Sequence, residues 1–246
     1  MRPLGCLLLV ACGSSGSTPA TVPDAPGSVD AAADTAVAAD APSGFGDLSG
    51  MCGVLAVADL TGPTPELFRA TFTFARAYMD PADRPLLTSG GQTLAATPNA
   101  GGSSGLSEIF AFEELARCEH ATLLKTETQI VYDTTGKITD MEVEIDGQKI
   151  GVSVTRAQTY PLGMTYTLDT ATTLITRKLN DIQTSTADVS AGDRWSKQVL
   201  AILAWDTQAA DTMAQAWQML SADVKADTLV VITTTDGDDT FIYTNQ

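Results

Sequence analysis

The sequence predicts an α/β fold in which helices pack on the faces of a mixed β-sheet. Residues 138–145 and 148–155 alternate apolar and polar positions around Asp146-Gly147, a strong signal for a β-hairpin. Residues 197–205 form a nearly continuous apolar run, which is typical of a strand covered on both faces. Helix-period segments separate this run from its neighbours. Strands joined by tight turns are antiparallel and strands separated by helices are parallel, so we expect a mixed sheet with flanking helices.

The remaining elements follow from local periodicity. Ser107 is a suitable N-cap for a helix over 107–120, which places Ile109, Phe112 and Leu115 on one face. Upstream, residues 67–75 alternate as a strand, and residues 88–105 are rich in Gly and Ser and are expected to form a loop. Downstream we expect strands at 122–132, 138–145 and 148–155, a helix at 167–186, a strand at 197–205, a helix at 207–226 and strands at 228–235 and 240–244.

The first eleven residues have the composition of a processing signal. A positive Arg2 precedes the apolar run Leu4–Ala11, which is too short to span a bilayer. The run ends in "LVAC", which resembles the bacterial lipobox, in which the Cys is acylated after cleavage. The resemblance implies a signal peptide over 1–11, lipidation (palmitate) at Cys12 and attachment to the membrane of the bacterial cell envelope. Gly13 after that Cys favours the outer membrane.

Three segments follow along the chain. Residues 12–47 carry the acylated Cys and a tether of Ala, Asp, Pro, Ser and Gly, which lacks the apolar side chains needed for a core. Residues 48–246 are expected to form a single globular domain with its core at 105–246. This order of segments is typical of a globular domain that is attached to a membrane through a lipid and a flexible linker.

The charge of the chain restricts its partners. It has 14 basic and 30 acidic side chains, a formal net charge of −16 at pH 7. Nucleic-acid-binding proteins usually show a basic patch, which this sequence lacks, so a nucleic-acid partner is disfavoured. We expect contact with a membrane through the lipid and with an unidentified protein or small ligand. Cys52 and Cys118 form either one disulfide or two buried thiols.

The predicted order helix, three strands, helix, strand resembles the αβββαβ core of the PD-(D/E)XK nuclease-like superfamily, whose fold is that of restriction endonucleases. The resemblance implies an acidic residue at the start of the second core strand, a (D/E)-x-K on the third and a Glu from the first helix, which together hold Mg²⁺. Asp140 matches the first position. Glu108, Glu113 or Glu114 could supply the helix carboxylate, and the tripeptide falls on Ser153-Val154-Thr155.

The tripeptide departs from the superfamily pattern. The hydroxyls of Ser153 and Thr155 replace neither a carboxylate ligand nor a Lys, although Lys149 or Arg156 could stand in for the cation. If a metal binds, Asp140 is the expected ligand. The segments "GQKIGVSVTRA" and "WSKQVL" are also similar to stretches in uncharacterised proteins, which supports the fold and adds no chemistry.

The sequence therefore favours a membrane-anchored lipoprotein whose domain binds or scaffolds without catalysis and without a cofactor. Two alternatives stay open. One is a divergent Mg²⁺-dependent nuclease that uses Asp140, and the other is an extracytoplasmic small-ligand binder that uses the Gly-rich loop.

Overall fold

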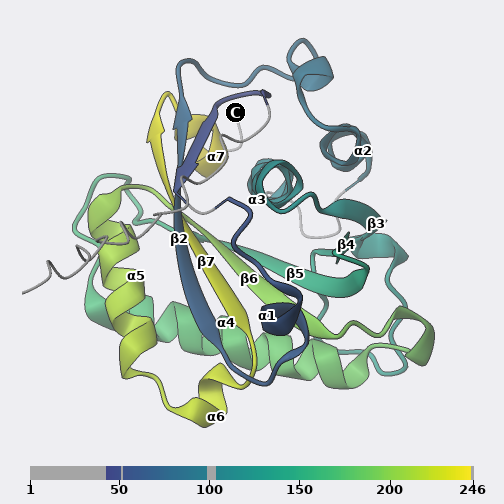
Figure 1. Cartoon of the computed structure of the whole chain (residues 1–246). Coiled ribbons are helices and arrows are strands. Elements are labelled where there is room, and N and C mark those ends of the chain that lie inside the picture. Colours follow the sequence, from purple (N-terminus) through teal and green to yellow (C-terminus); the bar gives the residue numbers. More distant parts are fainter. Residues whose placement is uncertain (1–42, 51, 99–103, 245–246) are drawn as a thin grey trace, which may run out of the picture. The chain divides into compact units, whose positions relative to one another are not determined.

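A seven-stranded mixed β-sheet forms the centre of the protein in the computed structural model, which describes residues 43–50, 52–98 and 104–244. The strands lie in the order β1-β2-β7-β6-β5-β4-β3 (Figure 1). Their bounds are β1 Asp47–Gly50, β2 Glu66–Phe74, β3 Thr122–Thr126, β4 Met141–Ile145, β5 Gln148–Ala157, β6 Lys197–Ala204 and β7 Leu229–Gly237.

Helices cover both faces of the sheet. On one face, α4 (Leu168–Asp188) and α5 (Thr207–Met219) bury Ile175, Leu179 and Met213 against β5, β6 and β7. On the other face, α3 (Gly105–Cys118) buries Phe112 and Leu115 against the strands, and α2 (Ser89–Ala96) lies beside it (Figure 1). The shorter helices are α1 (Val57–Thr61), α6 (Ala222–Lys225) and α7 (Thr240–Thr244).

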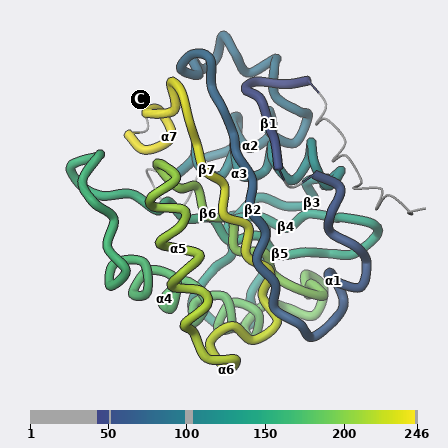
Figure 2. Tube along the Cα trace, turned by 60° about the vertical axis from the view of Figure 1, so that its left-hand side comes forward, coloured from purple at the N-terminus to yellow at the C-terminus, as the bar shows by residue number. Residues whose placement is uncertain are grey.

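The predicted fold class is confirmed. Strands β3, β4 and β5 form an antiparallel meander, and β5, β6 and β7 are parallel, because α4 and α5 connect them. The segment from α3 to β6 therefore follows the predicted order of one helix, three strands, one helix and one strand. Strand β2 precedes this core in the sequence but lies between β1 and β7 and runs parallel to β7 (Figure 2).

Several elements differ from the prediction. The expected strand over 122–132 ends at Thr126 and is followed by a short 3-10 helix, and the expected helix over 207–226 divides into α5 and α6. Residues 89–96, expected in a loop, form α2, because the Thr88 side chain accepts a hydrogen bond from Gly91 N and caps the helix. Residues 240–244, expected as an edge strand, form α7, in which Phe241, Ile242 and Tyr243 are all buried. Three consecutive buried side chains do not fit the alternation of an edge strand.

An aromatic cluster shows that the folded chain begins before the predicted boundary at residue 48. Phe45 is buried and packs against Phe74, Tyr78, Phe110 and Phe241. Residues 45–47 thus belong to the packed domain and not to the predicted tether. The rest of the tether, up to residue 42, lies outside the described residues.

Candidate functional site

Asp140 lies where β5 extends beyond the start of β4. Pairing of the two strands stops at Met141 and Val152, so the next part of β5 has no strand partner on this side. The side chain of Asp140 pairs with this part of β5 in place of a strand, because its Oδ2 accepts a hydrogen bond from Val154 N at 2.5 Å. Lys178 of α4 completes the arrangement, because its Nζ donates to Val154 O at 2.8 Å. Two side chains of opposite charge thus bracket one peptide segment of β5.

A second carboxylate acts on Asp140. Glu108, in the first turn of α3, is only 6% exposed and accepts a hydrogen bond from Ser104 Oγ at 2.6 Å. Burial, and then the negative charge of Glu108, raise the pKa of Asp140 to about 7, whereas Lys178 opposes this shift. Glu127 adds a smaller effect in the same direction as Glu108. Three elements therefore bring two acids and one Lys to the same end of β5.

The hydroxyls of the expected tripeptide do not join this cluster. Ser153 is 5% exposed and faces Gln198 Oε1 at 3.4 Å, inside a neutral network with Thr139 and Ser185. The network lies between β5 and α4, and the side chains named in it are all neutral. Thr155 is half-buried and follows on the same face, because side chains two residues apart on a strand point the same way.

The two cations considered from the sequence are used elsewhere. Arg156 donates to Ile242 O at 2.9 Å and so attaches β5 to α7. Burial lowers the pKa of Arg156, and the charges of Tyr243 and Glu108 oppose this shift. Lys149 donates to Gly192 O at 2.9 Å and pairs with Glu142 at 3.1 Å. The cation beside Asp140 is Lys178, which the sequence analysis missed. It follows the inward-facing Ile175 by three residues, so its position on the edge of the buried stripe was a usable signal.

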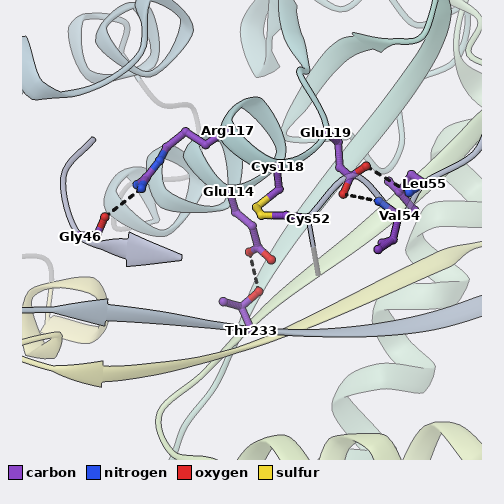
Figure 3. The surroundings of a disulfide bond; sticks show 9 residues. All are labelled: Gly46, Cys52, Val54, Leu55, Glu114, Arg117, Cys118, Glu119 and Thr233. Atoms are coloured by element: carbon purple, nitrogen blue, oxygen red, sulfur yellow. Dashed lines mark hydrogen bonds between the residues drawn. A yellow bond between two sulfur atoms is a disulfide. The ribbon is translucent and has the colours of Figure 1, made fainter. Parts of the chain in front are cut away.

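Glu114, the other helix carboxylate considered from the sequence, lies in a different place. It is 2% exposed, and its Oε2 accepts a hydrogen bond from Thr233 of β7 at 2.5 Å (Figure 3). Burial raises its pKa to about 7. Six residues separate Glu108 from Glu114, so they point to different sides of α3. Glu113 also lies apart from Asp140 and accepts hydrogen bonds from Thr88 N and Oγ1.

Cys52 and Cys118 form a disulfide at the C-terminal end of α3 (Figure 3). The residues on either side of Cys118 also form hydrogen bonds with the N-terminal segment that contains Cys52. Arg117 donates to Gly46 O at 2.9 Å, and Glu119 accepts from Leu55 N at 3.1 Å. Helix α3 therefore connects the N-terminal segment at one end with the Asp140 site at the other.

The carboxylate oxygens of this site are the type of ligand that a hard divalent cation prefers, but the site offers few of them. Among residues 43–50, 52–98 and 104–244, no group of three or more His, Cys, Asp or Glu side chains is arranged to hold a metal ion. Asp140 and Glu108 provide two carboxylates whose mutual repulsion a cation would relieve. Mg²⁺ is commonly bound by one or two carboxylates and takes its other oxygens from water and phosphate. Asp140, the expected ligand, therefore fits such an ion when Glu108 joins it.

Fold and site together define an α/β protein with two carboxylates and a Lys at the end of a central strand. No family model matches the chain, and no solved structure matches it. The chain is 40% identical over 153 residues to the "AAC-rich mRNA clone AAC4 protein" of Dictyostelium discoideum. The match covers 60% of this chain and 22% of that relative, so the chain spans about a fifth of the relative's length.

The source of this relative overturns the predictions of lipidation and of cellular location. It comes from a eukaryote, which contradicts the prediction of a bacterial lipoprotein with palmitate in the cell envelope and of a place in the outer membrane. The predicted signal peptide over 1–11 and Cys12 lie outside the described residues. Within the described part of the chain, none of the helices combines the length and apolar character needed to cross a membrane.

Proposed function

We propose that the domain is a divalent-metal-dependent phosphodiester hydrolase of the nuclease-like type, with Asp140, Glu108 and Lys178 as its charged residues. The convergence of these three side chains on the end of β5 carries the proposal. Asp140 stands before the second strand of the αβββαβ segment, Glu108 comes from its first helix, and Lys178 replaces the Lys absent from the third strand.

Each residue has a role that follows from its chemistry. Asp140 and Glu108 would bind the ion, which when present polarises a phosphate and lowers the pKa of a bound water. The ammonium group of Lys178 lies where positive charge would balance the negative charge that builds up on phosphate during hydrolysis. In the structure the same ammonium satisfies Val154 O, so it is already oriented towards the end of β5.

Lys178 offers a direct test with a matched neighbour. We expect the full chain with Mg²⁺ or Mn²⁺ to cleave labelled single-stranded DNA or RNA, and Lys178→Ala or Asp140→Asn to reduce the rate at least about 100-fold. Arg177→Ala serves as the control, because Arg177 precedes Lys178 on α4 but is exposed. Equal rates for Lys178→Ala and Arg177→Ala would contradict the proposal.

A non-catalytic binding domain is the second candidate. The observation in its favour is the buried Ser153–Gln198 network, which occupies the strand positions that carry charge in active members of the superfamily. No cleavage of any substrate by the wild-type chain, together with no heat of Mg²⁺ or Mn²⁺ binding in calorimetry, would support this role instead.

A further inference from the structure

We infer that the Cys52–Cys118 disulfide is a redox-active bond and that Glu114 donates a proton to Cys118 when a small thiol reduces it. The inference goes beyond the proposed hydrolase function, because it uses none of the residues assigned to the ion or to phosphate. It depends on the position of Glu114 on α3, on the unsatisfied oxygen of its carboxyl group and on the surroundings of the two sulfur atoms.

Glu114 and Cys118 share one face of α3. Four residues separate them, and side chains at this spacing lie one above the other on a helix, with Cβ atoms about 5–6 Å apart. Figure 3 shows the side chain of Glu114 beside the disulfide and directed towards Thr233 of β7. The carboxyl group of Glu114 is therefore placed close to the sulfur atom of Cys118.

The carboxyl group of Glu114 has an oxygen that the fold does not use. Glu114 is 2% exposed, and its Oε2 accepts the hydrogen bond from Thr233. Its Oε1 has no hydrogen-bond partner among the described residues. A buried polar atom without a partner costs stability, and in a native protein it often marks a redox or catalytic role. A proton on this carboxyl group is available to a neighbouring group that becomes basic.

The surroundings of Glu114 keep it protonated near neutral pH. Burial raises its pKa to about 7, the hydrogen bond from Thr233 opposes this shift, and the charge of Glu119 adds to it. Glu119 itself accepts a hydrogen bond from Leu55 N and is influenced by His120. Thr233 is the group of β7 that faces Glu114, and Glu119 is its charged neighbour on α3.

The two sulfur atoms have different surroundings. Cys52 is followed by Gly53 and Val54, which are exposed, and a side chain at Gly53 would meet no atom within 4 Å. Cys118 is 4% exposed and belongs to the face of α3 that carries Glu114. A small thiol therefore approaches Cys52 from solvent, and Cys118 is the sulfur that leaves on the buried side.

The reduction step balances with two thiols of the dithiothreitol or glutathione type. The thiolate of the first attacks Cys52 Sγ, the bond between the sulfur atoms breaks, and Cys118 Sγ leaves with the electron pair. A buried thiolate is costly, so the proton of Glu114 moves to Cys118 Sγ and leaves a carboxylate. The second thiol then attacks the mixed disulfide, is oxidised together with the first, and frees the thiol of Cys52. Water returns the proton to Glu114.

Backbone contacts hold the two cysteines together after reduction. Gly53 N donates to Cys118 O at 2.9 Å, and Leu55 N donates to Glu119 at 3.1 Å. Neither hydrogen bond involves a sulfur atom. The two thiols therefore stay close to each other, and an oxidant can restore the bond.

The rate of reduction tests the inference. The full chain is treated with dithiothreitol in the presence of a chelator and without nucleic acid, and free thiols are alkylated and counted by mass spectrometry. We expect Glu114→Gln to be reduced at least about tenfold more slowly than the wild type at about pH 6. The difference should disappear by about pH 8.5, because Glu114 has then lost its proton. Glu113→Gln is the control and should keep the wild-type rate, because Glu113 binds Thr88 instead.

The ratio of two rates at one pH removes the titration of dithiothreitol itself. Equal rates for Glu114→Gln and the wild type, or a ratio that does not change with pH, would overturn the inference, since a structural effect alone would not follow the protonation of Glu114. Thr233→Val provides a second test if Glu114→Gln does not fold. It removes the hydrogen bond that lowers the pKa of Glu114, so its rate relative to the wild type should rise between about pH 7 and pH 8. A relative rate that is independent of pH would contradict the inference.

Discussion

The domain buries several carboxylates, and each has a different means of stabilisation. Glu114 depends on Thr233 and has its other oxygen without a hydrogen-bond partner among the described residues. Glu142 of β4 makes no hydrogen bond with either oxygen within the same part of the chain and depends on Lys149. Glu114 makes the stability of the domain sensitive to pH, and Glu142 makes it sensitive to the loss of a single cation.

Glu114 should make the protein less stable as the pH rises towards neutrality. Its pKa in the folded state is raised to about 7 from 4.5, so the folded state keeps a proton that the unfolded state releases. The contribution is fully present below about pH 4.5 and is lost, on the order of 3 kcal/mol, by about pH 7. We expect Glu114→Gln to reduce the fall in the free energy of unfolding between pH 5 and pH 7.5, measured with urea. Exposed Glu144→Gln should keep the wild-type slope, and an equal slope in Glu114→Gln would refute the prediction.

Lys149 should matter more than a surface Lys. Its partner Glu142 has a side chain that is 1% exposed, whereas Lys149 itself is 41% exposed. Lys149→Met leaves a buried carboxylate without its cation, and we expect a loss of about 1–3 kcal/mol, discounted for the exposure of Lys149. Adding Glu142→Gln should recover most of this loss. Lys137→Met, which removes the exposed cation that pairs with the half-buried Asp181, should cost less than about 1 kcal/mol. Equal losses for the two Lys variants in urea unfolding would contradict this account.

At the scale of elements, α3 organises the domain. Its first turn places Glu108 at the candidate site, its middle packs on the sheet, and its end binds the N-terminal segment through Arg117, Cys118 and Glu119. The N-terminal segment also supplies β1, the antiparallel neighbour of β2. Loss of the Cys52–Cys118 bond would therefore loosen one edge of the sheet.

The disulfide should be a main contributor to stability. It joins residues 66 positions apart, and a loop of this length restricts the unfolded chain substantially. We expect the double variant Cys52→Ser with Cys118→Ser to lose roughly 2–4 kcal/mol in urea unfolding. A reducing agent should destabilise the wild-type chain by a similar amount and leave the double variant unaffected. If the agent destabilises both proteins equally, the disulfide is not the cause.

At the scale of the whole molecule, local patterns predicted the meander and the parallel strands, because the Asp146-Gly147 turn and the buried run at 197–205 each specify one pairing. They did not predict the place of β2 between β1 and β7, which depends on long-range pairing with β7. Helix α7 was missed because its burial against α3 decides its conformation. Asp140 was identified from its place before a strand, whereas Lys178 lies 38 positions later and meets it through the packing of α4.

The central claim is that Asp140 and Glu108 bind a divalent ion next to Lys178. Crystals of the full chain grown with Mn²⁺ test it most directly, because the anomalous scattering of manganese locates the ion. The account predicts one strong peak between the carboxylates of Asp140 and Glu108, which disappears in crystals of Asp140→Asn. A peak at other residues, or none at saturating Mn²⁺, would contradict it.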